Sequence, residues 1–276
     1  MIVWEILKAV LFGIVEGITE WLPVSSTGHM ILLNEFVSLN VSPEFWEMFE
    51  VVIQLGAILA VVVLFFGKLN PFAPSKTKEE KRGTWSLWFR VIVAVLPSAV
   101  IGLVLDDWFN AHFYNYRTVA IMLVVYGIAF ILIERLRRGK ETRMERVEEI
   151  TYRDALLIGG FQVLSIIPGT SRSGSTILGA MLFGLSRTAA AEFSFYLAIP
   201  TMAGASLLKG AKYFLGGNMP TSGEWAILAV GCLVAFGVSM LAIRYLMEYV
   251  RRHSFSAFGV YRIVLGALVF GYFLFA

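Results

Sequence analysis

Two short polar stretches, set in an otherwise apolar chain, hold the residues most able to do chemistry. The first reads EGITEWLPVSSTGH and runs from Glu16 to His29, and the second reads PGTSRSGST and runs from Pro168 to Thr176. Together they supply carboxylates, hydroxyls, an imidazole and a guanidinium. Such a set can bind an anion, move protons and provide a nucleophile, so it favours a catalytic site over a packing role.

Glu16 and Glu20 are four residues apart, so a helix presents both carboxylates on one face. Two ionised carboxylates at membrane depth repel each other, and burying each one costs several kcal/mol. A divalent cation, a partner arginine or protonation of one member must offset this cost. The alternative is a solvated pair at the outer interface that has no role.

The hydroxyls of Ser25, Ser26 and Thr27 follow Pro23 and precede an apolar run. Serine and threonine commonly cap helices, and capping alone could explain them. A helix N-terminus also presents free amides and the positive end of its dipole to an anion. The stretch therefore predicts either a cap or an anion site at the start of a short helix.

His29 and Arg172 are the two remaining ionisable residues of these stretches. A single histidine is often only a hydrogen-bonding partner, but beside two carboxylates it could act as a general base, a nucleophile or a metal ligand. Arg172 lies between two serines, and its planar guanidinium suits phosphate oxygens. The alternative for Arg172 is an internal salt bridge to Glu16 or Glu20.

The elements that must position these residues are membrane helices. Of the 276 residues, 58% are hydrophobic and 16% are charged, whereas soluble domains have roughly 45–50% apolar and about 25% charged residues. The single cysteine excludes an internal disulfide and a thiolate metal cluster. Residues 2–37 and 153–184 are apolar segments interrupted by Pro, Gly, Ser and Thr, as expected of broken, re-entrant helix pairs. Six further segments are long enough to span as helices: 45–67, 89–105, 119–133, 192–209, 225–246 and 258–275.

Lysine and arginine are concentrated in three segments, 68–88, 134–153 and 251–252. Cytoplasmic loops of membrane proteins carry such an excess, so these three should be cytoplasmic. The clustering fits membrane topology rather than nucleic-acid binding. Counting spans from these loops, the first broken pair enters from outside and the second from the cytoplasm.

This opposite orientation indicates an inverted-topology repeat. The prediction is an all-α integral membrane protein with six full transmembrane helices and two broken re-entrant pairs, forming a single membrane domain over 1–276. The first repeat covers 1–140 and the second covers 151–276. An ungapped shift of 145 residues supports the pairing, because it places Pro23 on Pro168, Ser26 on Ser171 and Glu47 on Glu192.

The two polar stretches resemble the signatures of the undecaprenyl-pyrophosphate phosphatase (bacitracin-resistance) family, and the span distribution is similar over essentially the whole chain. Trp21 and Thr170 are variants at neighbouring sites. The resemblance implies hydrolysis of undecaprenyl diphosphate to undecaprenyl phosphate and inorganic phosphate, which recycles the carrier lipid for cell-wall synthesis. It implies catalytic roles for Glu16, Glu20, Ser26, His29 and Arg172, and substrate contacts for Ser25, Thr27, Ser171, Ser173 and Thr176.

The resemblance also implies a divalent cation, Mg²⁺ or Ca²⁺, for which Glu16 and Glu20 are the expected ligands. The nucleophile stays open between Ser26, His29 and water. The expected partners are a polyprenyl diphosphate lipid and the bilayer, without nucleic acid, and the oligomeric state is open, a homodimer included. The expected location is the bacterial plasma membrane, with the active site facing outward. A secondary transporter or lipid flippase is the alternative, because inverted repeats with broken helices also define carriers.

Overall fold

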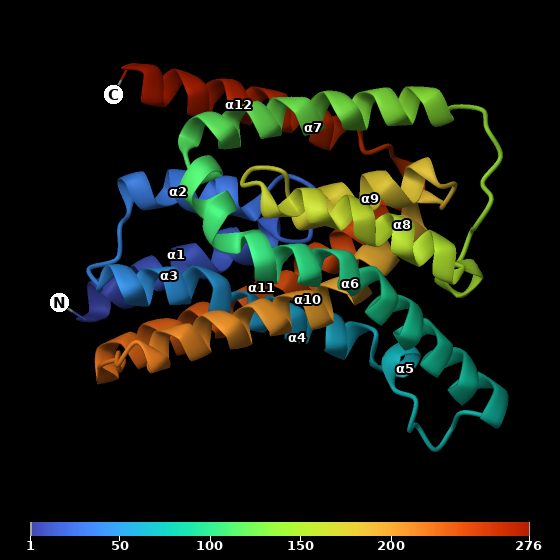
Figure 1. The fold of residues 1–276 in the computed structure, drawn as a ribbon, viewed down its shortest axis with the longest axis horizontal. Helices are drawn as coiled ribbons and strands as arrows, with labels where there is room; N and C mark the ends of the chain where they lie inside the picture. The colour runs from blue at the N-terminus through green and yellow to red at the C-terminus, as the bar shows by residue number, and fades with distance from the viewer. Residues whose placement is uncertain (1, 276) are drawn as a thin grey trace.

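A computed structural model describes residues 2–275, apart from the side chains of residues 106, 107, 110 and 275, and within this range it contains helices and no β-strand. Most helices lie roughly along one axis of the bundle (Figure 1). The helices are α1 (Ile2–Thr19), α2 (Ser26–Phe36), α3 (Pro43–Val52), α4 (Gln54–Leu64), α5 (Phe66–Leu69), α6 (Lys78–Phe113), α7 (Tyr116–Arg137), η1 (Val147–Glu149), α8 (Tyr152–Val163), η2 (Leu164–Ile166), α9 (Arg172–Leu182), α10 (Arg187–Leu215), α11 (Ser222–Arg252) and α12 (Ser256–Phe275).

Within the described residues, five helical stretches have the length and hydropathy of a membrane span: α3 with α4, the Lys78–Leu105 part of α6, α7, α11 and α12. This confirms the predicted all-α membrane protein. The predicted sixth span, α10, does not reach that hydropathy. It contains Pro200, and most of its first half is buried, so it has little need of a lipid-facing apolar surface. The count of six full spans stays a prediction.

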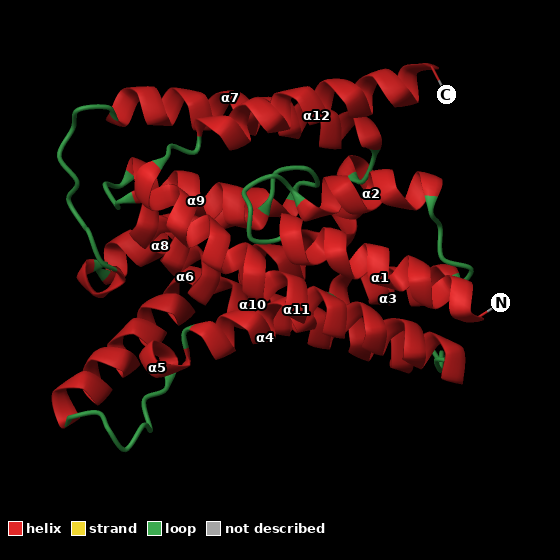
Figure 2. Cartoon of the chain, turned by 180° about the vertical axis from the view of Figure 1, so that it is seen from behind, coloured by secondary structure: helices red, strands yellow, loops and turns green. Residues whose placement is uncertain are grey.

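The two interrupted segments are helical hairpins. In the first, Lys8 near the start of α1 donates to the carbonyl of Ser38 beyond α2 at 2.7 Å. In the second, Arg143 pairs with Asp154 of α8, and Met144 lies against Leu185 just beyond α9. The hairpins enter the bundle from opposite ends (Figure 1), and their loops come together near its centre when the molecule is seen from behind (Figure 2).

The second helix of each hairpin begins in the same way. Ser25 caps α2 and Ser171 caps α9, and both have a φ of 74°. Each hydroxyl accepts a hydrogen bond from the amide three residues later, Gly28 at 3.3 Å and Gly174 at 3.1 Å. A positive φ costs a non-glycine residue about 1–3 kcal/mol, so the surrounding structure must hold both serines in place. The caps are one residue further apart than the predicted shift of 145, because the second loop has an extra residue after its proline. The inverted repeat itself stays a prediction.

Close backbone packing fixes the first helix of each hairpin. At Gly17, beside Glu16, a Cβ atom would lie 2.9 Å from the carbonyl oxygen of Ala235 in α11. At Gly159 in α8, a Cβ would lie 2.2 Å from the carbonyl oxygen of Ala94 in α6. Small residues allow such contacts between membrane helices. The glycine inside the acidic motif therefore serves helix packing.

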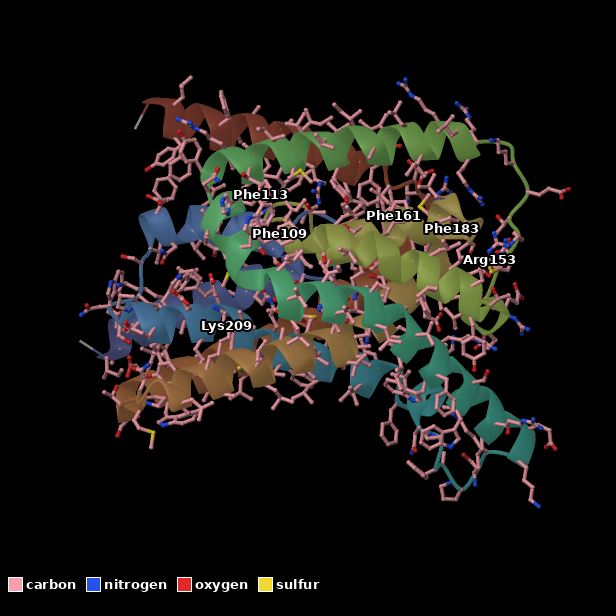
Figure 3. The ribbon with its side chains drawn as sticks, in the orientation of Figure 1. Phe109, Phe113, Arg153, Phe161, Phe183 and Lys209 are labelled. Carbon is pink, nitrogen blue, oxygen red and sulfur yellow. The ribbon has the colours of Figure 1, made fainter. Side chains whose placement is uncertain are left out.

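The predicted cytoplasmic segments gather at one end of the bundle. Glu134, at the end of α7, pairs with Arg187 at 2.6 Å and accepts from the amide of Phe255, between α11 and α12, at 2.8 Å. Arg153 lies at this end, whereas Lys209 lies toward the other (Figure 3). Lys209 pairs with Glu47 at 3.2 Å, so this cation on the less basic side is matched by an anion.

Candidate active site

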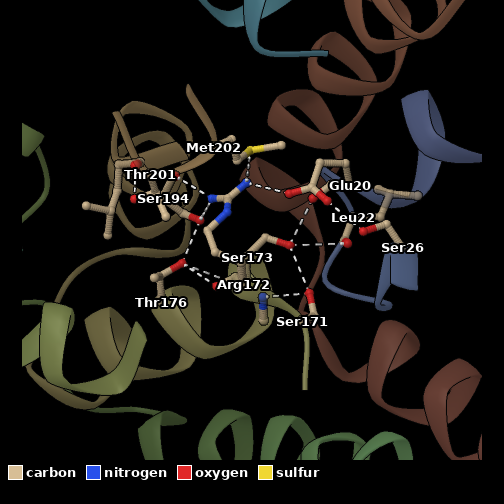
Figure 4. A network of polar contacts seen from close by, with 12 residues as sticks. Glu20, Leu22, Ser26, Ser171, Arg172, Ser173, Thr176, Ser194, Thr201 and Met202 are labelled. Atoms are coloured by element: carbon tan, nitrogen blue, oxygen red, sulfur yellow. Dashed lines mark hydrogen bonds and ion pairs between the residues drawn. The ribbon is translucent and has the colours of Figure 1, made fainter. Parts of the chain in front are cut away.

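Arg172 and Glu20 join the tips of the two hairpins. Nη2 of Arg172 donates to Oε1 of Glu20 at 2.8 Å, and the two side chains are only 10% and 7% exposed. Nη1 donates to the carbonyl of Ser194 at 2.7 Å (Figure 4). Trp21 packs beside the guanidinium, 5.8 Å from the ring centroid. This is the internal salt bridge that the sequence left as an alternative. It is compatible with anion binding, because the same planar fork of donors serves carboxylates and phosphates.

Ser26 lies on the other side of the same carboxylate. Its hydroxyl donates to Oε2 of Glu20 at 2.6 Å, and both residues are buried. The bond is possible because Ser26 is the first residue of α2 and Glu20 belongs to the turn that follows α1. Glu20 is thus held between a guanidinium and a hydroxyl. A hydroxyl bonded to a base that a third group orients is the usual arrangement of an activated nucleophile.

Further hydroxyls hold the two tips together. Ser173 donates to the carbonyl of Glu20 at 3.1 Å and lies 3.1 Å from the hydroxyl of Ser171. Thr176 lies 2.7 Å from the hydroxyl of Ser194, which also accepts from Arg172 at 3.1 Å. These bonds draw α9, α10 and the first loop into one polar network (Figure 4). Ser173 and Thr176 therefore support the wall of the site.

A cavity of about 170 Å³ lies at this junction. Five of the ten predicted site residues line it: Glu20, Ser26, Thr27, Ser171 and Arg172. The other five, Glu16, Ser25, His29, Ser173 and Thr176, lie outside its lining.

Known proteins are similar to this chain over nearly its whole length, which includes the two motifs that meet at this cavity. The family model described as bacitracin resistance protein BacA matches residues 9–268. The chain belongs to the BacA family. Proteins named undecaprenyl-diphosphatase from Enterococcus faecalis and Limosilactobacillus fermentum are 57% and 56% identical to it, each over 98% of both chains. One of the same name from Streptococcus thermophilus is 58% identical over 97% of this chain and 93% of its own. The family predicted from the motifs is confirmed.

Glu16 is the least satisfied group near the BacA-family site. It is 1% exposed, and neither carboxylate oxygen has a hydrogen-bond partner among the described residues. A buried carboxylate without a partner is costly, so it requires a cation or a proton. Within the described residues, no three or more His, Cys, Asp or Glu side chains form a cluster that could hold a metal. A cation here would therefore need ligands from the substrate or from water.

His29 faces away from the ion pair, toward α12. Its Nδ1 lies 2.7 Å from the carbonyl oxygen of Ser25, and its Nε2 lies 2.7 Å from the hydroxyl of Tyr261. The imidazole and the Tyr261 ring are stacked with 5.7 Å between centroids. In the described part of the chain, no hydrogen bond joins His29 to Glu20 or Ser26. The geometry pairs Ser26 with Glu20 instead.

Three polar residues that line the cavity were missed from the sequence: Gln54, Ser165 and Thr201. Gln54 begins α4 immediately after the break that separates it from α3, and Thr201 follows Pro200 within α10. A polar side chain beside a helix break in an apolar segment was the available signal. Gln162 supports Thr201 by donating to its hydroxyl at 3.3 Å.

Proposed function

We propose that this BacA-family chain hydrolyses undecaprenyl diphosphate to undecaprenyl phosphate and inorganic phosphate. The observation that carries the proposal is the row formed by Arg172, Glu20 and Ser26 at the cavity between the hairpin tips. A guanidinium, a carboxylate and a hydroxyl in contact can bind a phosphoryl group, accept a proton and attack phosphorus. The names of the close relatives support the same substrate.

Binding of the diphosphate activates Ser26 in this proposal. The phosphate oxygens compete with Glu20 for Nη2 of Arg172, which frees the carboxylate to act as a base. The Ser26 hydroxyl then bonds to the terminal phosphorus, and its proton passes to Glu20. The bond from that phosphorus to the bridging oxygen breaks, and undecaprenyl phosphate leaves with the electron pair.

Water completes the cycle by attacking the phosphoserine. The phosphorus–serine bond breaks, and inorganic phosphate leaves. The proton that Glu20 already holds returns to the Ser26 oxygen, and Glu20 takes a proton from the water. Glu20 then releases this proton to solvent, which restores the carboxylate for the next turnover. Direct attack by water on the diphosphate, with Glu20 as its base, is the alternative route. The two differ in whether a phosphorylated Ser26 forms.

The two helix N-termini add positive potential to the cavity. Ser26 and Thr27 open α2, and Arg172 and Ser173 open α9; among the described residues, their backbone amides have no hydrogen-bond partner. Such amides and the helix dipole stabilise a phosphate group. Convergence of both termini on one cavity favours an anion with more than one negative charge.

Glu16 and Glu20 would hold a divalent cation. The two unpartnered oxygens of Glu16 fit this role. Mg²⁺ is commonly bound by one or two carboxylates together with substrate phosphates and water, whereas Ca²⁺ takes more protein ligands. Two carboxylates and a diphosphate therefore suit Mg²⁺ better. When bound, the cation would neutralise charge on the bridging and terminal oxygens.

The site opens toward the outer side of the bacterial plasma membrane in this proposal. The basic segments gathered at one end of the bundle support it, because the positive-inside rule places that end in the cytoplasm. A homodimer stays a prediction.

Phosphate release from undecaprenyl diphosphate by purified protein in detergent tests the proposal. The enzyme releases phosphate without a sealed compartment, whereas a transporter or flippase would release none and would act only across a vesicle membrane. Absence of phosphate release under any divalent cation would overturn the proposed reaction.

A further inference from the structure

Arg262 of α12 is a buried cation that the proposed reaction does not use. It is 0% exposed. Among the residues whose side chains are described, it has no carboxylate partner, and all of its hydrogen bonds go to backbone carbonyls. Burying an unpaired charge costs several kcal/mol. Hydrogen bonds that stabilise the fold, or a role in function, must offset this cost.

The carbonyls that Arg262 binds belong to both hairpin tips. Nη1 donates to Pro23 in the first loop at 3.1 Å, and Nη2 donates to Gly169 and Thr170 in the second loop at 2.8 Å and 3.0 Å. Nη2 also approaches the carbonyl of Met122 at 3.4 Å. The planar guanidinium thus joins two loops that are distant in sequence, one from each predicted repeat. A lysine, which has one nitrogen, could not reproduce these directions.

These carbonyls lie directly before the caps that orient the site. Pro23 is two residues before Ser25, and Thr170 immediately precedes Ser171. Both caps hold a positive φ that their own residue type disfavours. Fixing the preceding carbonyls restrains these conformations and therefore the starting points of α2 and α9.

The surroundings of the guanidinium are shaped to keep it in place. Tyr126 of α7 lies 5.5 Å from it, measured to the ring centroid. At Gly174, a Cβ atom would lie 3.3 Å from Nη1, so glycine leaves room for the cation at the first turn of α9. The preceding residue of α12, Tyr261, holds His29 of α2 at 2.7 Å. Two consecutive side chains of α12 thus reach the elements that carry the site.

We propose that Arg262 is a positioning residue for the diphosphatase reaction: it clamps the loop before α2 to the loop before α9, so that Ser26 and Glu20 stay in register with Arg172. The inference rests on the proposed function for its catalytic consequence, but the clamp itself is a structural statement that can be measured separately. If Arg262 had a purely structural role, its substitution would lower the stability of the whole protein without a separate effect on kcat or on the two loops. Misplacing reacting groups by about 1 Å can cost about 10²-fold in rate.

The test compares Arg262→Lys and Arg262→Met with Leu265→Ala. Leu265 is buried on the same helix and packs in a cluster with Val119 and Leu123, so the control weakens the packing of α12 without removing a side-chain hydrogen bond to either loop. The readouts are kcat and KM for undecaprenyl diphosphate, the thermal unfolding midpoint, and hydrogen exchange of peptides that cover residues 22–30 and 168–176.

We expect both Arg262 variants to lose about 10²-fold in kcat, with KM changed far less and with faster exchange in both loops. Leu265→Ala should unfold at a lower temperature yet keep its kcat and its loop exchange. Equal losses of kcat in the Arg262 variants and in Leu265→Ala, or unchanged exchange in either loop, would overturn the proposal. If the wild-type protein released no phosphate, the proposed function would fail, while the exchange data would still decide whether the clamp exists.

Discussion

The hydroxyl of Ser26 donates to Oε2 of Glu20 at 2.6 Å, while Oε1 of the same carboxylate accepts from Arg172 at 2.8 Å. One carboxylate therefore links the proposed nucleophile on the first hairpin to the proposed phosphate-binding group on the second. The catalytic proposal depends on this shared contact.

Ser26→Ala should lower kcat by at least about 10²-fold, because it removes the nucleophile while leaving the ion pair of Glu20 intact. Rapid quenching of the wild-type reaction followed by mass spectrometry should detect a phosphorylated Ser26. Ser38→Ala, an exposed serine in the loop after α2, is the control and should leave kcat unchanged. A Ser26→Ala variant of near wild-type rate, with no phosphoserine in the wild type, would favour direct attack by water.

Arg172→Lys should reduce kcat/KM by about 10²-fold or more, because a single ammonium cannot replace a fork that contacts phosphate in two directions. Arg172→Ala should also destabilise the protein by about 3–5 kcal/mol, since it leaves Glu20 buried and unpaired. Steady-state kinetics and thermal unfolding in detergent measure the two effects. Arg146→Lys serves as a matched control, because Arg146 is exposed and, among the side chains that the structure describes, its ion-pair partner is Glu149 at 3.4 Å. If Arg172→Lys kept full activity, the proposed role of the Arg172 guanidinium in substrate binding would be wrong.

A chelator should abolish phosphate release by the wild-type protein, and added Mg²⁺ should restore it. Glu16→Gln should raise the Mg²⁺ concentration needed for half-maximal activity by about tenfold or more, because even outer-shell substitutions at metal sites cost about 10–100-fold in affinity. Titration of Mg²⁺ against phosphate release measures the shift. An identical Mg²⁺ dependence in Glu16→Gln would show that the buried carboxylate is neutralised by a proton instead.

The orientation predicts which end of the bundle reacts from outside the cell. With Cys232 replaced by serine, Asn40→Cys should react with a membrane-impermeant maleimide in intact cells. Lys140→Cys should react only after permeabilisation. Both positions are exposed, and they lie beyond α2 and in the basic segment after α7. The reverse pattern of labelling would place the proposed site on the cytoplasmic side.

The sequence was sufficient for the helical membrane fold and for the two hairpins, because apolar length and interruptions by proline and glycine are local properties. It was also sufficient to name Glu20, Ser26 and Arg172 as candidates, since charged and hydroxyl side chains in an apolar segment stand out. It could not show that Arg172 meets Glu20 across 152 positions, or that His29 turns toward Tyr261, because those contacts depend on how the helices pack.

Arg262 illustrates the same limit. In the sequence it is one arginine within an apolar helix near the C-terminus, and nothing local marks it as a partner of Pro23 and Gly169. The sequence also could not show that Ser25 corresponds to Ser171. An ungapped alignment has no place for the extra residue between Pro168 and Ser171, so it paired Ser26 with Ser171 instead. Local pattern thus named the candidate reacting groups, and tertiary packing determined which of them touch.

The most direct measurement is the rate of phosphate release from undecaprenyl diphosphate by Glu20→Gln, with Glu47→Gln as the control. Glu47 is also an ion-paired glutamate, but its side chain is 66% exposed and its partner is Lys209. We predict a loss of at least about 10³-fold in kcat for Glu20→Gln, and no more than a twofold change, roughly, for Glu47→Gln, where only a surface ion pair is lost. A Glu20→Gln variant that retained the wild-type rate would contradict the account.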